Sequence, residues 1–186
     1  MCKIKYGIFF FIVLFQLNIQ AKVTTQQEYI DSLITVAATL PNDSAKVVLL
    51  ERIGYFYISL NPTEGKKYTT KALELARELG LKNREAASIA LLAANYAANS
   101  EYDKALQYNF EAIKIFKSLN NQKANMDLAR EVLRVSRIKY KEGVGSSIEV
   151  TQAQTELETA ENNYIQALYN ALVSKVDLDN AYGRIQ

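Results

Sequence analysis

The chain has 186 residues, of which 49% are hydrophobic and 23% charged, and its 22 Lys and Arg residues nearly balance 20 Asp and Glu residues. This is the composition of an ordinary folded protein, and so small a net charge gives no electrostatic reason to expect a nucleic-acid partner. There is no His, and Cys2 is the single Cys, so the usual metal sites and His-based or Cys-based catalysis are almost excluded. Few Gly and Pro residues favour a mostly helical fold.

Residues 1–21 have the pattern of a secretory signal peptide. Two lysines form a basic start, an unbroken apolar run covers residues 8–15, and Ala21 offers a small residue at the cleavage position. The run is shorter than the about 20 apolar residues that a transmembrane helix needs. We therefore expect an exported protein that is cleaved after Ala21 and has no membrane span in the mature chain.

A first helical pattern lies in residues 22–44. Large apolar residues recur on one stripe at helical spacing, and Pro41 ends the pattern. The stripe consists of Tyr29, Leu33, Val36 and Leu40. We expect one N-terminal helix here, followed by polar residues that can cap the next helix.

Residues 45–121 contain an internal repeat. The spacing is 39 residues between Tyr57 and Tyr96, and 40 residues between Ala72 and Ala112. Each unit has the pattern of two short helices joined by a turn, at residues 61–64 in the first unit and 99–101 in the second. The repeat therefore predicts stacked pairs of helices.

This pattern resembles the tetratricopeptide repeat (TPR), in which a Gly, a Tyr and small Ala residues recur. The second unit, residues 84–117, follows the TPR pattern except that Ala93 stands where Gly is usual. A third unit is not expected, because Gln152 falls where its Ala should be. The resemblance implies a scaffold or sensor module that ends near residue 121.

The same resemblance implies a concave face on the second unit. This face would present only small side chains: Ala87, Ala90, Ala94, Ala97 and Ala98. So plain a surface favours packing against another helix, such as the chain's own C-terminal arm. The alternative is that these alanines are simply part of the core.

Residues 122–186 have the pattern of an antiparallel helical hairpin. Gly143 suits the left-handed residue that ends a helix, and Ser146 with Glu149 predicts a capping box in which each side chain satisfies a backbone N–H. The incoming helix offers a facing apolar stripe of Leu128, Val132, Val135 and Ile138. The tip, which we expect to contact a partner, consists of Gly143, Val144, Gly145, Ser146, Ser147 and Glu149.

The outgoing helix carries a seam in which spacings of three and four residues alternate. Its members are Val150, Ala153, Leu157, Ala160, Tyr164, Ala167, Ala171, Ser174, Leu178 and Ala181. Such a period is typical of a helix that keeps one side against a partner helix, and small residues allow close approach. We expect the seam to be buried in a tight hairpin; an ordinary amphipathic core helix is the alternative.

Residues 125–184 resemble the C-terminal segment of the outer-membrane efflux protein family, the TolC-like exit ducts. The most telling part is Tyr140 with Gly143 in the turn, followed by the pair Glu149 and Val150. The resemblance implies a hairpin whose tip faces the periplasm and meets a membrane-fusion adaptor. No stretch of about ten residues has the alternating polarity of a membrane strand, so the sequence predicts no β-barrel.

Taken together, the sequence predicts an all-α fold with TPR-like helix pairs followed by a long antiparallel coiled-coil-type hairpin. It predicts a non-enzymatic protein without cofactors, in the periplasm or at the periplasmic side of the outer membrane, that joins or regulates an efflux assembly. The expected partners are an adaptor-like periplasmic protein, efflux subunits, or a second copy bound through the hairpin. Two alternatives stay open: a TPR scaffold or sensor module of the envelope, and a fusion remnant or truncated open reading frame.

Overall fold

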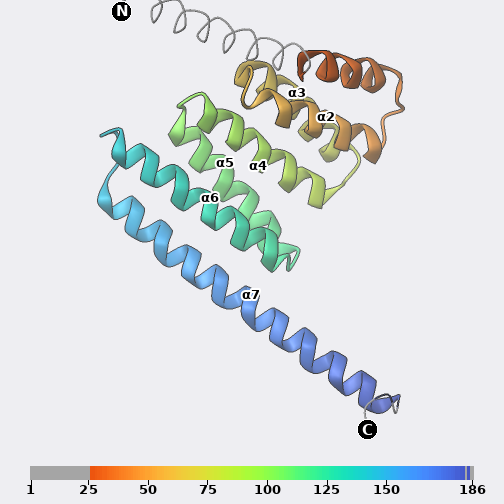
Figure 1. Ribbon diagram of the computed structural model, residues 1–186, viewed down its shortest axis with the longest axis vertical. Helices are drawn as coiled ribbons and strands as arrows, with labels where there is room; N and C mark the ends of the chain where they lie inside the picture. The colour runs from red at the N-terminus through yellow and green to blue at the C-terminus, as the bar shows by residue number, and fades with distance from the viewer. Residues whose placement is uncertain (1–25, 183, 185–186) are drawn as a thin grey trace, which may run out of the picture.

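The computed structural model describes residues 26–182 and 184, and this part of the chain is built from α-helices (Figure 1). A helix over residues 26–39 comes first. It is followed by α2 (Ser44–Tyr57), α3 (Pro62–Glu78), α4 (Lys82–Ala98), α5 (Tyr102–Ser118), α6 (Gln122–Lys141) and α7 (Ser147–Ala181). The prediction of an all-α fold is confirmed, whereas the predicted signal peptide lies outside the described residues.

The helices form antiparallel pairs that stack one after another (Figure 1). The pairs are α2 with α3, α4 with α5, and α6 with α7, and each helix also packs on the one that follows it. The turns within the pairs lie at residues 58–61, 99–101 and 142–146. Local chemistry explains their positions: Asn61 caps α3 through the Glu64 N–H at 3.3 Å, and Pro62 occupies the first turn of that helix.

Helices α6 and α7 continue the same stack beyond residue 121, where the TPR-like sequence pattern was predicted to end. Leu73 in α3, Ile113 in α5 and Ala153 in α7 are spaced by 40 residues, and all three are buried. The same spacing joins buried positions of α4 and α6, as in Ile89 and Ala129, Leu92 and Val132, and Ala93 and Leu133. The residue types change from pair to pair, but the equivalent positions stay buried. This holds even in α6 and α7, where the TPR-like sequence pattern is no longer present.

One cluster of buried apolar side chains runs from α3 to α7. It includes Leu73, Leu92, Ile113, Leu133 and Leu157, one from each of these helices. A second cluster joins the helix over residues 26–39 to α2 and α3. Residues on both sides of position 121 share the first cluster, so the hairpin packs as the last pair of one stack.

Gly65 allows the first two pairs to approach closely. A Cβ atom at this position would overlap the side-chain amide of Asn95 and would lie 3.1 Å from the Gly54 carbonyl oxygen. Asn95 is fully buried and donates to the backbone carbonyl of Leu91 at 3.0 Å and to that of Gly54 at 3.4 Å. The absence of a side chain at Gly65 therefore leaves room for a buried polar contact between the pairs.

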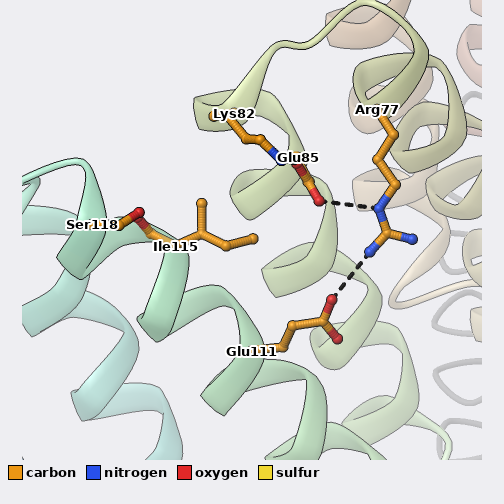
Figure 2. A network of polar contacts seen from close by, with 6 residues as sticks. All are labelled: Arg77, Lys82, Glu85, Glu111, Ile115 and Ser118. Carbon is orange, nitrogen blue, oxygen red and sulfur yellow. Dashed lines mark hydrogen bonds and ion pairs between the residues drawn. The ribbon is translucent and has the colours of Figure 1, made fainter.

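Ion pairs connect α3 to both helices of the second pair (Figure 2). The Arg77 guanidinium donates to Glu85 in α4 and to Glu111 in α5, each at 3.1 Å. Lys82 Nζ lies 2.7 Å from Glu85. The Lys82 hydrogen bond, with the Arg77 hydrogen bond in addition, outweighs burial and lowers the pKa of Glu85. This buried carboxylate is therefore ionised at neutral pH and paired on two sides.

Helix α7 extends well beyond α6 (Figure 1), because α7 has 35 residues and α6 has 20. Along the predicted seam, Ala153, Leu157 and Ala160 are buried, Val150 and Tyr164 are half-buried, and Ala167, Ala171 and Leu178 are exposed. The expectation that α6 buries the whole seam is therefore wrong for its last part, where α7 has outrun its partner. We call residues 161–182 the arm.

Candidate interaction site at the helical tip

The turn between α6 and α7, residues 142–146, is short and closely packed. Gly143 has a φ of +76°, a left-handed conformation that favours glycine. A Cβ atom on Gly145 would lie 3.0 Å from the Cγ of Lys139 and 3.1 Å from the backbone nitrogen of Tyr140. The loop therefore lies directly on the last turn of α6, and the predicted stop and start of helix within a few residues is confirmed.

The predicted capping box at the start of α7 forms only in part. The Ser146 hydroxyl accepts a hydrogen bond from the Glu149 N–H at 3.2 Å, as expected. The Glu149 carboxylate, however, lies 3.1 Å from Lys139 Nζ instead of turning back to the Ser146 backbone. An ammonium group is a stronger partner for a carboxylate than a neutral N–H, which explains why the Glu149 carboxylate turns toward Lys139.

Lys139 joins three helices at the base of the tip. The residue is 8% exposed, and its Nζ lies 2.7 Å from Asp103 in α5 as well as near Glu149 in α7. The hydrogen bond to Asp103 chiefly raises the pKa of Lys139, against the opposing effect of burial. Lys139 thus pairs with two carboxylates, and its contact with Asp103, whose side chain is 87% exposed, links the tip to α5.

Lys139 was not among the site residues predicted from the sequence. The available signal was a basic residue that continues the buried face of α6 one turn after Val135. Such a residue on an apolar face indicates a buried ion pair. Its partner Asp103 could not be found in this way, because it lies on another helix and far away in the sequence.

Further polar contacts join the tip to the neighbouring turns. The Tyr102 hydroxyl donates to Glu142 at 2.8 Å. One pair earlier, Glu101 accepts from Lys66 at 2.6 Å and from Lys104 at 2.8 Å. These bonds, that of Lys104 first, lower the pKa of Glu101 to about 2. The turns of all three pairs therefore lie at one edge of the stack.

Large apolar side chains are exposed at this tip. Val144 is 65% exposed, Ile148 66% and Tyr140 51%. Val144 was among the predicted contact residues, whereas Ile148 and Tyr140 were not. Of the other predicted residues, Gly143, Ser146 and Ser147 are exposed, and Gly145 and Glu149 are half-buried. Exposed apolar side chains on a fixed loop are well suited to contact a protein partner.

The predicted alanine face lies on α4. Ala87, Ala90, Ala94 and Ala97 are half-buried, and Ala98 is exposed. Ala87 lines an open, mostly apolar hollow of about 470 Å³ together with Tyr55, Phe56 and Leu91. The expectation that the C-terminal arm covers this face is wrong, because α7 packs against α6 instead.

The arm exposes a continuous set of large apolar side chains. Between 40% and 62% of each remains exposed in Ile165, Leu168, Tyr169, Leu172, Val173 and Val176. They lie beside the small seam residues Ala167 and Ala171. An amphipathic helix normally buries such a face against another element, so the arm has the surface of a helix that packs on a partner.

The described part of the chain offers little to other classes of site. Within residues 26–182 and 184, no three acidic or Cys side chains come together in a way that could hold a metal ion. Over the same residues, none of the helices combines the length and apolar character needed to cross a membrane.

Comparison with known families agrees with this emphasis on the C-terminal part. A family model described as outer membrane efflux protein matches residues 70–184, which is more than half of the chain. The match begins within α3 and so starts well before residue 125, where we expected the resemblance to begin. No curated protein matches the chain significantly.

Proposed function

Since this chain belongs to the outer membrane efflux protein family, we propose that it is a non-enzymatic exported protein that joins or regulates an efflux assembly. It acts in the periplasm or at the periplasmic side of the outer membrane. The tip of α6 and α7 contacts an adaptor-like periplasmic protein or efflux subunits, and the preceding helix pairs serve as a TPR-like docking module.

The observation that carries this proposal is the exposure of Val144 and Ile148 on a loop that is held in place. Both side chains are about two-thirds exposed. Gly145 packs on the last turn of α6, Ser146 caps α7 and Lys139 pairs with Glu149, so the loop has little conformational freedom to lose when a partner binds. A fixed apolar tip with a polar surround is a suitable centre for a protein interface.

The arm supports a second contact, with another copy of this chain. Its seam residues Ala167 and Ala171 are small and exposed, and large apolar side chains flank them. Small seam residues allow two helices to approach closely, and the flanking residues then fill the remaining space. Self-association through the arm would bury the surface that α6 leaves open.

The hollow between α2 and α4 favours one alternative function. Its apolar lining, which includes Tyr55, Phe56 and Leu91, could receive a segment of a partner protein. In that case the chain is a TPR-type scaffold or sensor, and the hairpin only completes the stack. The two functions differ in which surface the partner contacts.

Site-specific photo-cross-linking in the cell envelope tests the proposal. A photoreactive residue at Val144 or Ser146 should capture a periplasmic adaptor that mass spectrometry identifies. Asn120 provides the matched control, because it lies in an exposed turn at the opposite edge of the stack. A probe at this position should not capture the adaptor.

Two further positions separate the remaining possibilities. A probe at Ala94 reports on the alanine face, and a probe at Ala167 reports on the arm. Capture of a partner at Ala94, with none at the tip, would overturn the proposal in favour of the scaffold function. Capture of a second copy at Ala167 would support self-association through the arm.

A further inference from the structure

A cavity of about 630 Å³ lies between α5, α6 and α7. Apolar side chains form much of its wall: Leu106, Phe110, Ile113, Val132 and Ala153. Its size falls within the range of about 300 to 1,000 Å³ that is usual for small-molecule sites. The tip contact and the arm do not account for this space.

The 40-residue spacing explains why the cavity exists. Ser136 and Glu156 line it, and the residues 40 positions earlier are Tyr96 and Phe116. Tyr96 stacks on Tyr108 with ring centroids 5.3 Å apart, and Phe116 is buried in the core. These two aromatic rings therefore fill space at the second pair. At the equivalent positions of the last pair, Ser136 is small and Glu156 is polar, and neither side chain carries a ring. This leaves room for a ligand.

The charges around the cavity differ between its two ends. Near the tip, Lys139 is already paired with Asp103 and Glu149. Toward the other end of α5, Lys117 is paired with Glu156 at 2.7 Å. Lys114 also lines the cavity, and it forms no ion pair with any residue among 26–182 and 184. An anionic ligand group would therefore be favoured at the Lys114 end, away from Asp103 and Glu149.

We propose that this cavity binds a small aromatic carboxylate. The aromatic rings occupy the space that Tyr96 and Phe116 fill one pair earlier, in contact with Phe110 and Ala153. The carboxylate pairs with Lys114 at the rim. This inference is independent of the proposed efflux role, because it requires neither the tip nor the arm.

Isothermal titration calorimetry of the purified chain with 2-naphthoate tests the inference. We expect saturable binding at one site, and binding of the neutral analogue 2-naphthalenemethanol that is weaker by about tenfold, because a charge-assisted contact is lost. Lys114→Gln should weaken naphthoate binding by a similar factor. Lys123→Gln is the matched control: Lys123 is an exposed lysine on α6 away from the cavity, and its replacement should change nothing.

Filling the cavity provides a second, independent test. Ser136→Tyr introduces the residue found 40 positions earlier and should weaken naphthoate binding by more than about tenfold while the circular dichroism spectrum stays helical. Ser174→Tyr, at an exposed position on the arm, should leave binding unchanged. If Ser136→Tyr does not fold, the smaller Ser136→Leu fills part of the same space without breaking an ion pair of the cavity wall and decides the question.

Two results would overturn the inference. One is the absence of naphthoate binding, or binding that the cavity-filling variants do not weaken. The other is a set of amide chemical-shift changes that gather on the arm around Leu168 and Leu172 instead of around Ile113 and Ala153. The second result would mean that the ligand merely coats the exposed apolar stripe.

Discussion

The second helix pair, α4 with α5, and the last pair, α6 with α7, occupy successive places in one stack but complete their interfaces differently. Their buried positions recur at a 40-residue spacing. In the second pair, Tyr96 stacks on Tyr108 and Phe116 is buried in the core, whereas Ser136 and Glu156 at the equivalent positions of the last pair line a cavity. The last pair is also unequal in length, so the arm extends into solvent.

The same arrangement of buried positions can therefore support either a filled interface or a cavity between helix pairs. Buried residues such as Leu92 and Val132 position the helices, and they remain apolar in both pairs. The residues that fill the spaces between pairs are free to change, and each change exposes a surface or opens a cavity.

The shared core should make the two pairs unfold together. Ile89→Ala removes a fully buried side chain from this core and should lower the free energy of unfolding by about 2 to 5 kcal/mol. Leu172→Ala, on the exposed arm, is the control and should change it by less than about 0.5 kcal/mol. Urea unfolding followed with labels on α4 and on α6 should give coincident transitions; separate transitions would show that the pairs are independent units.

Larger side chains in the seam should destabilise the fold only where α6 covers the seam. Ala160→Leu overpacks a buried position and should destabilise the fold by about 2 to 3 kcal/mol. Ala167→Leu lies on the exposed arm and should change the stability of the single chain by less than about 0.5 kcal/mol. Thermal unfolding at low protein concentration measures both. Equal destabilisation by the two variants would contradict the extent of burial described for α7.

The contact between the first two pairs depends on a glycine that the contact between the second and third pairs lacks. Gly65→Ala should destabilise by about 1 to 2 kcal/mol, since the overlap with Asn95 exceeds the gain in helix propensity. The residues 40 positions after Gly65 and Asn95 are Ala105 and Val135, which pair a larger residue with an apolar one. Adding Asn95→Val to Gly65→Ala should therefore recover part of the loss. A double variant less stable than the single one would show that Asn95 contributes mainly through its hydrogen bonds.

The smallest expected effect concerns Glu101 at the edge that carries the turns. Its folded-state pKa of about 2 lies below the ordinary value of 4.5, so its ionised form stabilises the fold above pH 4.5 and this contribution is lost as the pH falls toward 2. Glu101→Gln should lower the melting temperature at neutral pH, and the difference from the original chain should vanish near pH 2. Glu78→Gln, at an exposed position, serves as the control. A difference that does not depend on pH would refute this role.

Several elements could be predicted from single short stretches. Asn61 with Pro62 marks the start of α3, and Gly143 with Ser146 marks the turn before α7. Caps and left-handed glycines act within a few residues, so the sequence displays them directly. For the same reason, Val144 could be predicted as an exposed residue of the tip.

Other features depend on residues that meet only in the folded chain. The hairpin of α6 and α7 was predicted, but its place as the third pair of the same stack was not, because Gln152 breaks the TPR pattern while Ala153 keeps the burial pattern. The fixed base of the tip was missed because Lys139 and Asp103 belong to different helices. The capping box was half wrong because a buried ammonium group, invisible in a local pattern, competes for the Glu149 carboxylate.

The start of α3, the end of α6 and the start of α7 thus follow from short stretches of sequence, because their signals are local hydrogen-bonding and backbone preferences. Only the tertiary structure decided that Ala160 is buried and Ala167 is not, since this depends on the length of α6 relative to α7. It also decided that a cavity follows the second pair. Whether space between helices is filled depends on side chains contributed by several helices at once, and no single stretch of sequence contains them all.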